Sequence, residues 1–242
     1  MSENPLPRAG WNLRDMVWAS LTALVLVVGG AVFASIAVFV LAGLGVGAST
    51  RLLTLIIFGL EAVLIIPAWI WGPQKYGGGW PQLGLRRAPL VRSIVLVVVG
   101  LAIVIAVNVA WDAIRQRIGL AGQPEVLPLF GSGPQGLALA LLLGGVVAPV
   151  AEEIFFRGFL YAGFRHRWGV GWGMLASSVV FALVHITPGV LLPIFIIGLV
   201  LAFLYEHTQS LWPNIVLHAA INSIAFVSVY AAAQGGAILA GY

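Results

Sequence analysis

Long apolar segments follow one another almost without interruption along this chain. Hydrophobic residues make up 61% of its 242 residues and charged residues only 8%, against about 25% charged residues in an average soluble domain. A water-soluble fold of this length could not bury so much apolar surface, so we expect lipid to surround most of the chain. The segments long enough to cross a bilayer are 16–44, 53–72, 93–112, 135–163, 172–187, 189–207 and 211–232.

These segments predict helices, because backbone groups in lipid must pair internally and no alternating strand pattern is present. We therefore expect residues 1–242 to form a single integral membrane domain of the all-α class, a polytopic bundle with seven to eight spans. The count is open because 172–187 is short, whereas 16–44 and 135–163 are long. The first run also exceeds the 7–15 apolar residues of a signal-peptide core, so we expect an uncleaved anchor.

The net charge of +4 is explained by cations that flank the predicted spans. No clustered basic face is present, so we expect no nucleic-acid partner. The absence of cysteine excludes disulfides and cysteine nucleophiles. The bias of Lys and Arg places the N-terminal segment 1–15 in the cytoplasm, with eight cations inside and three outside. The inside group is Arg8, Arg14, Lys75, Arg86, Arg87, Arg92, Arg165 and Arg167, and the outside group is Arg51, Arg115 and Arg117.

Several ionisable or strongly polar residues lie within the predicted spans. An ionisable group at mid-bilayer costs roughly 2.5–3.5 kcal/mol on insertion scales, so the residues that persist there usually face a protein cavity and have a function. Our candidates for such a site are Glu61, Glu152, Glu153, Arg157, His185, His218 and Asn222.

The two adjacent glutamates differ in their helical neighbours. Glu153 and Arg157 are spaced i,i+4 in the favourable order and can neutralise each other. Glu152 has Phe156 at that spacing, so it remains free to accept a proton as a general base. Pro149 predicts a kink that would open a polar pocket beside them. The alternative is a buried ion network that only fixes helix packing.

The remaining candidates lie on two other predicted helices. His185 follows Phe181 by four residues, so the phenyl ring could form a wall beside it, although a lone histidine there is more often a packing residue. His218 and Asn222 also share one helix face, where the alternative is polar contact between helices. All of them lie at similar depth, and together they form a set able to activate water. Glu61 either lines the same cavity or forms a separate structural pair.

The three motifs, in order, resemble the CPBP family of intramembrane peptidases, which includes CAAX prenyl proteases and the Abi group linked to bacteriocin processing or self-immunity. The motifs are Glu-Glu-x-x-x-Arg at 152–157, Phe-x-x-x-His at 181–185 and His-x-x-x-Asn at 218–222. The resemblance covers about 130–230, which would be the peptidase core. Leu-Gly-Leu-Arg at 83–86 also resembles bacterial members.

The resemblance implies a role for each motif residue. Glu152 would activate the hydrolytic water with His185 as its partner, while His218 and Asn222 would stabilise the oxyanion. Glu153 and the supporting residues Arg157 and Phe181 would complete the catalytic site.

Metal dependence stays open at this stage. Glu152, His185 and His218 are the candidate ligands for Zn²⁺ or another divalent metal, because two histidines and a carboxylate can hold zinc with one open position. A metal-free Glu/His water is the alternative, and the usual His-Glu-x-x-His zinc signature is absent.

The function that follows from the resemblance is intramembrane endopeptidase, a hydrolase in a bacterial plasma membrane. Its partners would be the lipid bilayer and a peptide or protein substrate, either prenylated or a small secreted peptide. The alternatives are a non-catalytic immunity or scaffold protein on the same fold, and a proton-coupled transporter, for which no internal repeat is found.

Overall fold

The computed structural model describes residues 9–45, 50–122, 126–131 and 133–240. These residues are helical with short connecting turns and form no strand, which confirms the predicted all-α class. Residues 1–8 of the predicted cytoplasmic segment, including Arg8, lie outside the described residues, as does the side chain of Arg51.

Most of the chain is α-helix, interrupted by short 3-10 and π-helical segments. The α-helices are α1 (Leu13–Gly43), α2 (Thr50–Leu60), α3 (Ile65–Trp69), α4 (Leu90–Arg117), α5 (Gly133–Leu142), α6 (Ala148–Glu152), α7 (Ala162–Leu183), α8 (Leu191–Thr208) and α9 (Leu211–Ala240). The 3-10 segments are η1 (Glu61–Leu64), η3 (Trp80–Leu83), η4 (Leu127–Phe130) and η7 (Pro188–Val190). The π-helical segments are η2 (Ile70–Gln74), η5 (Leu143–Val147) and η6 (Glu153–Tyr161).

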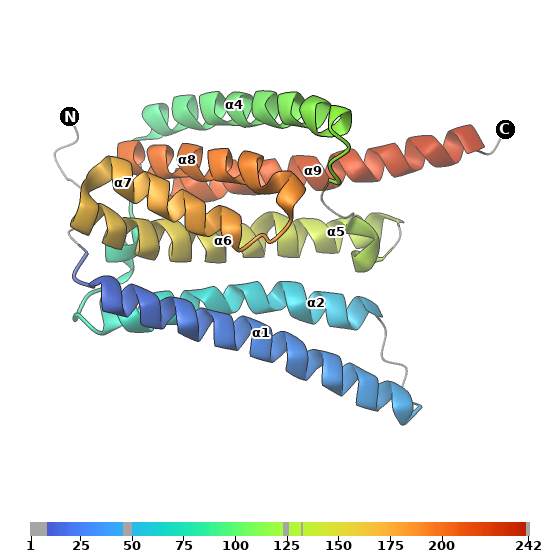
Figure 1. The fold of residues 1–242 in the computed structure, drawn as a ribbon, viewed down its shortest axis with the longest axis horizontal. Coiled ribbons are helices and arrows are strands. Elements are labelled where there is room, and N and C mark those ends of the chain that lie inside the picture. Colours follow the sequence, from blue (N-terminus) through green and yellow to red (C-terminus); the bar gives the residue numbers. More distant parts are fainter. Residues whose placement is uncertain (1–8, 46–49, 123–125, 132, 241–242) are drawn as a thin grey trace.

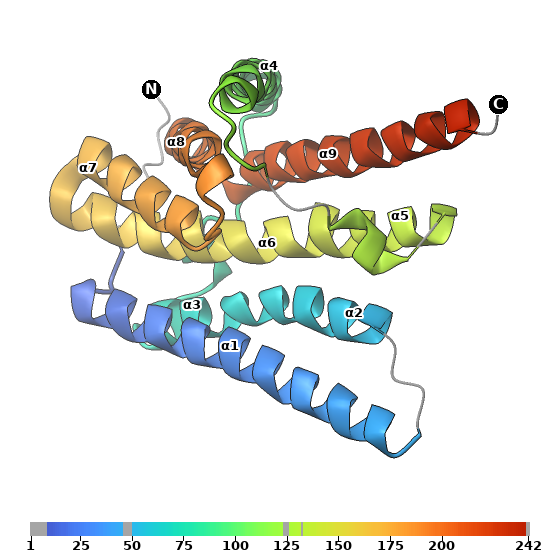
Figure 2. The same ribbon diagram turned by 45° about the vertical axis from the view of Figure 1, so that its right-hand side comes forward.

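Six continuous helices among the described residues are long and apolar enough to cross a membrane. The sequence predicts seven to eight spans, and the difference lies in the helix Gly133–Leu183, which contains both 135–163 and 172–187. Gly169, at φ 80° and ψ 175°, interrupts this helix. The chain turns back there, so that the end of α7 runs beside α6 (Figures 1 and 2). The two predicted spans are therefore the two arms of one helical segment, which reverses at Gly169.

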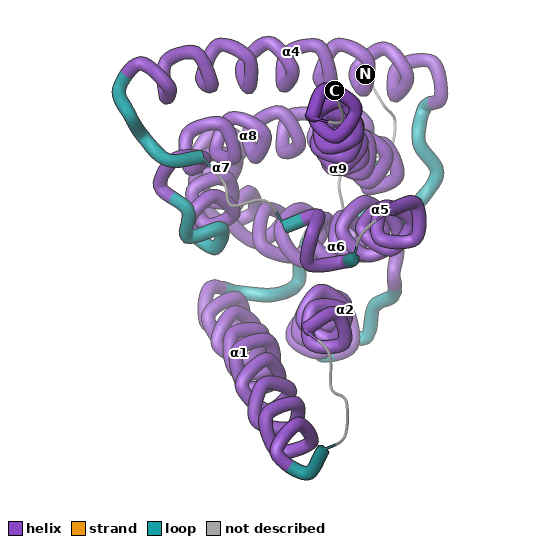
Figure 3. The backbone as a smooth tube through the Cα atoms, turned by 90° about the vertical axis from the view of Figure 1, so that its right-hand side faces the viewer, coloured by secondary structure: helices purple, strands orange, loops and turns teal. Residues whose placement is uncertain are grey.

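The helices form a bundle around the α5–α6–α7 segment. α1 and α2 lie on one side of α6, whereas α4, α8 and α9 lie on the other side (Figure 3). All nine residues of η6 are buried, including Glu153 and Arg157. Since η6 follows α6 directly, the Glu-Glu-x-x-x-Arg motif lies at the centre of the bundle rather than against lipid.

Most described cations gather at one end of the bundle. The starts of α1, α4 and α9, the end of α8 and the turn at Gly169 all lie at that end, on the left of Figure 1. The cations on these elements are Arg14, Lys75, Arg86, Arg87, Arg92, Arg165 and Arg167, whereas Arg115 and Arg117 lie at the opposite end of α4. The described members of the two groups expected from the sequence are therefore separated by the length of the bundle.

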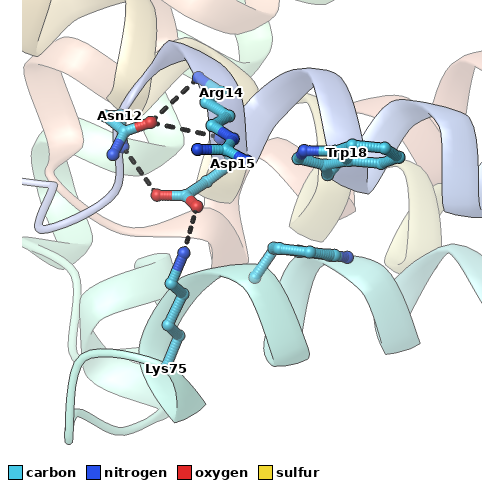
Figure 4. Close-up of a pocket in the computed structure, with 6 residues that line it drawn as sticks. Asn12, Arg14, Asp15, Trp18 and Lys75 are labelled. Atoms are coloured by element: carbon cyan, nitrogen blue, oxygen red, sulfur yellow. Dashed lines mark hydrogen bonds and ion pairs between the residues drawn. The ribbon is translucent and has the colours of Figure 1, made fainter.

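The start of α1 is fixed to the end of η2 by a buried carboxylate. Asp15, only 1% exposed, accepts hydrogen bonds from Lys75 Nζ at 2.5 Å and from the Tyr76 hydroxyl at 2.6 Å. The hydrogen bond to Asp15 raises the pKa of the Tyr76 phenol. A pocket of about 490 Å³ opens beside this contact, and Figure 4 shows Lys75 pointing to Asp15 across it.

The residues before α1 also contact η6. The indole of Trp11 stacks on Phe159 with ring centroids 5.1 Å apart, and its N–H donates to the Phe159 carbonyl at 2.9 Å. The Trp11 side chain is 2% exposed. This contact pairs a carbonyl of the π-helical segment and holds the N-terminal residues against the central helix.

We expect Trp11→Phe to lower the free energy of unfolding by about 0.5–1.5 kcal/mol, because the Phe159 carbonyl loses one of its two donors and keeps the Ala162 N–H, while the aromatic ring is retained. Thermal unfolding of the detergent-solubilised protein measures this change. Trp172→Phe is the matched control, since Trp172 is 69% exposed and substitutions of this kind usually stay within about 0.5 kcal/mol. Equal losses in both variants would contradict the role of the Trp11 hydrogen bond.

Candidate active site

The helix that carries the two glutamates is widened just before them. In a π-helical turn the carbonyl of residue i pairs with the N–H of residue i+5. For Gly144, in η5, that residue is Pro149, which has no N–H. Asn222 replaces it, because Asn222 Nδ2 donates to the Gly144 carbonyl at 2.9 Å. The helix therefore accommodates Pro149 by widening, with the freed carbonyl paired from α9.

Glu153 is held by three partners from two helices. Its Oε1 accepts from Arg157 Nη1 at 2.8 Å and lies 2.8 Å from His218 Nδ1, and its Oε2 accepts from Asn214 Nδ2 at 3.2 Å. The carboxylate is 0% exposed. All these contacts fix Glu153 in place, so it is suited to orient His218 and not to bind a substrate.

Glu152 has a different environment on the neighbouring face of the same helix. Its side chain is 15% exposed, and its Oε2 lies 3.7 Å from His218 Nε2, which is beyond hydrogen-bond distance. Within the described residues this buried oxygen has no hydrogen-bond partner. Buried carboxylate oxygens are normally paired, so an open acceptor beside an imidazole nitrogen is suited to receive a proton from a water molecule.

His218 lies between the two glutamates. With a proton on Nδ1 it donates to the Glu153 carboxylate, which directs Nε2 toward Glu152. Its ring packs edge-on against Phe181 at 5.8 Å between centroids. Phe181 also lies under the Arg157 guanidinium at 4.1 Å, so one phenyl ring contacts both Arg157 and His218.

His185 is placed at the rim of this cluster. It follows the end of α7, and its Nδ1 lies 2.8 Å from the Phe181 carbonyl. Its ring contacts the Phe181 ring at 4.9 Å between centroids. In the part of the chain that the structure describes, no hydrogen bond or ion pair joins His185 to Glu152, and His218 occupies that position instead.

The predicted metal ligands Glu152, His185 and His218 do not converge. His218 Nδ1 faces Glu153 and His185 Nδ1 faces a backbone carbonyl, and each ring contacts the Phe181 ring. No group of three His, Asp or Glu side chains that could hold a metal ion is found among the described residues. The donors in this arrangement therefore do not fit the three-ligand zinc site that the sequence suggests.

Glu61 lies near the same carboxylates. It begins η1, the 3-10 turn between α2 and α3 that packs against α6. Glu61 is mostly buried, and its carboxyl group interacts electrostatically with that of Glu152. Of the two roles that the sequence leaves open, this interaction favours a place beside Glu152.

Asn214 is the partner that sequence reasoning missed. It is fully buried, and besides Glu153 its Nδ2 donates to the Leu201 carbonyl at 2.7 Å. A signal was present, because Asn214, His218 and Asn222 are each four residues apart and therefore share one face of α9. The motif His-x-x-x-Asn is thus the second half of a longer polar stripe.

Comparison with known proteins identifies similar sequences. Residues 134–224 match the family model described as Type II CAAX prenyl endopeptidase Rce1-like, and they include every predicted site residue except Glu61. The chain is 28% identical over 141 residues to the Bacillus subtilis (strain 168) protein named "Putative membrane peptidase YdiL". That match covers 53% of this chain and 57% of the relative, so the chain spans little more than half of that protein's length. No solved structure matches the chain significantly.

Proposed function

We propose that this chain is a membrane endopeptidase of the CPBP family of CAAX-type intramembrane peptidases, in which Glu152 activates the hydrolytic water. The observation that carries the proposal is the unpaired, buried Oε2 of Glu152, which faces His218 Nε2 at 3.7 Å. A water molecule beside both atoms can donate a hydrogen bond to the carboxylate while its oxygen faces a peptide carbonyl.

The proposed reaction moves one proton at a time. Glu152 takes a proton from water, the resulting hydroxide adds to the carbonyl carbon of the scissile bond, and the carbonyl electrons move to its oxygen. The tetrahedral intermediate then collapses as Glu152 returns the proton to the amide nitrogen, and the carbon–nitrogen bond breaks. General base catalysis of this kind contributes typically about 10²–10⁴-fold in rate.

We assign His218 to the stabilisation of the oxyanion. With Glu152 and Glu153 ionised, the positive charges of Arg157 and a doubly protonated His218 balance both carboxylates, and Nε2–H of His218 is then a donor. Asn222 keeps one amide hydrogen beyond its bond to Gly144 and is the second predicted donor. Donors of this type are worth about 2.7–4 kcal/mol of barrier each. His185, at the rim, is positioned to contact the substrate chain rather than the water.

The substrate in this proposal is a peptide or protein segment that reaches the bundle interior from the bilayer. Two classes fit the family: a protein with a prenylated C-terminal cysteine, and a small secreted peptide processed in a bacterium. We further propose a plasma-membrane location with the N-terminus in the cytoplasm, which puts the cation-rich end of the bundle inside, as the positive-inside rule expects.

The direct test is cleavage by the purified protein in liposomes. A prenylated C-terminal peptide and a panel of bacterial secreted precursor peptides are incubated with wild type and with Glu152→Ala, and the products are identified by mass spectrometry. We expect a defined product from one substrate class with wild type alone. Product formation at equal rates by both proteins would refute the role of Glu152, and no product from either class would refute the peptidase proposal.

We expect cleavage to survive metal removal, because the predicted zinc ligands do not come together. After treatment with a strong chelator, and with zinc content checked by elemental analysis, kcat/KM should remain within about two-fold of the untreated value. Loss of activity that returns on addition of zinc would contradict this expectation, and would mean that His185 moves to join Glu152 and His218 during the reaction.

A further inference from the structure

The Leu-Gly-Leu-Arg segment at 83–86 is not explained by the proposed reaction. Leu83 is fully buried at the end of η3, and Gly84 adopts φ 86°, a left-handed conformation that favours glycine. A Cβ on Gly84 would also collide with the Tyr205 ring of α8. The segment therefore packs tightly against the end of α8, although the two are more than 100 residues apart in the sequence.

Arg86 connects this segment to the turn between α8 and α9. Its Nε donates to the Gln209 carbonyl at 2.5 Å, and its Nη2 donates to Gln209 Oε1 at 3.2 Å. Contacts also run in the other direction, because Ser210 Oγ donates to the Arg86 carbonyl at 2.5 Å and the Leu211 N–H donates to the Gly84 carbonyl at 2.8 Å. Four hydrogen bonds therefore join 84–86 to 209–211.

The turn held in this way has an unusual backbone. Gln209 has φ 60°, a left-handed conformation that residues other than glycine adopt rarely and only when surrounding contacts hold it. It ends α8, and α9 begins two residues later at Leu211. The guanidinium of Arg86 therefore binds the residue at which the chain reverses.

The position of this turn fixes the position of the site. Asn214 and His218 lie one and two helical turns after Leu211, so a shift or rotation of the start of α9 moves both of them relative to Glu153. The same segment also touches the glutamate helix, since a Cβ on Gly158 would lie 2.5 Å from the Leu83 carbonyl. Segment 83–86 thus contacts both helices that must be aligned for the Glu153–His218 bond.

We propose that Arg86 is a positioning residue that sets the register of α9 against η6, and so the geometry of His218 between the two glutamates. Its effect on cleavage rests on the proposed peptidase function, whereas its effect on the α8–α9 turn does not. Arg87 offers a matched control, because it is adjacent and exposed, and in the described residues it makes no hydrogen bond or ion pair.

The first measurement is amide hydrogen exchange, read by mass spectrometry in detergent, for Arg86→Ala, Arg86→Lys and Arg87→Ala. We expect the exchange rate across 208–218 to rise about ten-fold or more in Arg86→Ala. The rise should be smaller in Arg86→Lys, because lysine keeps one donor. Arg87→Ala should show no rise. Unchanged exchange in Arg86→Ala would overturn the proposal whatever the enzyme does. If Arg86→Ala does not fold, Ser210→Ala removes a bond from the other side, and the same comparison applies.

The second measurement separates positioning from stability. We expect kcat of Arg86→Ala to fall about 10–100-fold with KM within two-fold of wild type, because a displacement of about 1 Å in a catalytic group can lower the rate by that much. Raised exchange with unchanged kcat would overturn the positioning role. If wild type cleaves neither substrate class, the proposed function fails, and the exchange comparison alone decides whether Arg86 holds the turn.

Discussion

Replacing Arg157 with methionine is expected to lower the free energy of unfolding by about 3–5 kcal/mol, the usual result of removing one partner from a buried ion pair. Arg157 is 1% exposed and Glu153 is 0% exposed, so water cannot solvate the carboxylate left behind. The substitution also removes the contact between the guanidinium and the Phe181 ring. Thermal or denaturant unfolding in detergent, compared with wild type, measures the change.

A second substitution distinguishes the loss of charge balance from the loss of packing. Adding Glu153→Gln to Arg157→Met removes the unpaired charge, so the double variant should recover part of the stability, though without activity. Arg167→Met is the control for the same chemical change at an exposed position, and it should stay within about 0.5 kcal/mol of wild type. A double variant less stable than Arg157→Met would show that packing, and not charge, dominates.

The central residues of the site could be predicted from the sequence because ionisable residues are rare within membrane-spanning segments. The i,i+4 spacing predicts the ion pair of Glu153 with Arg157, and the structure contains it at 2.8 Å. The same rule leaves Glu152 without a local partner, and its Oε2 is unpaired in the structure. These features follow from helix geometry alone, which fixes which neighbours along one helix can meet.

Contacts between helices could not be predicted in this way. Helical spacing does not say which of the two histidines approaches Glu152, and the structure brings His218 there while His185 faces the Phe181 carbonyl. Nor does it show that α7 ends before His185, or that Asn222 pairs with the Gly144 carbonyl. Each of these depends on the register between helices, which is set by the turns and by contacts such as those of Arg86.

The predicted spans 135–163 and 172–187 require a turn between them, and the structure has one at Gly169. Hydropathy separates 135–163 from 172–187, but it does not show that the helical hydrogen-bond pattern continues on both sides of a single glycine. The number of continuous helices and the number of crossings therefore differ. A glycine with φ 80° can reverse the chain at almost no steric cost, so the turn needs no long loop beyond the short polar segment 165–167 that precedes it.

The largest kinetic effect is expected from the pair Glu152 and His218. Glu152→Gln should lower kcat about 10³-fold, because the amide cannot accept the proton from water. His218→Leu should lower kcat by about 10²–10³-fold, because leucine has no donor for the oxyanion. In both variants KM should stay within a few-fold of wild type, since neither residue is assigned to the binding of the substrate chain.

The double variant Glu152→Gln/His218→Leu tests whether the two residues act together. Groups that act on the same water and the same intermediate are strongly non-additive, so the double variant should be only slightly slower than the slower single variant. Steady-state cleavage in liposomes gives all four rate constants. If the two effects instead multiply, to about 10⁵–10⁶-fold from the single-variant estimates above, Glu152 and His218 act in separate steps. The 3.7 Å gap between Glu152 Oε2 and His218 Nε2 would then not be the water site.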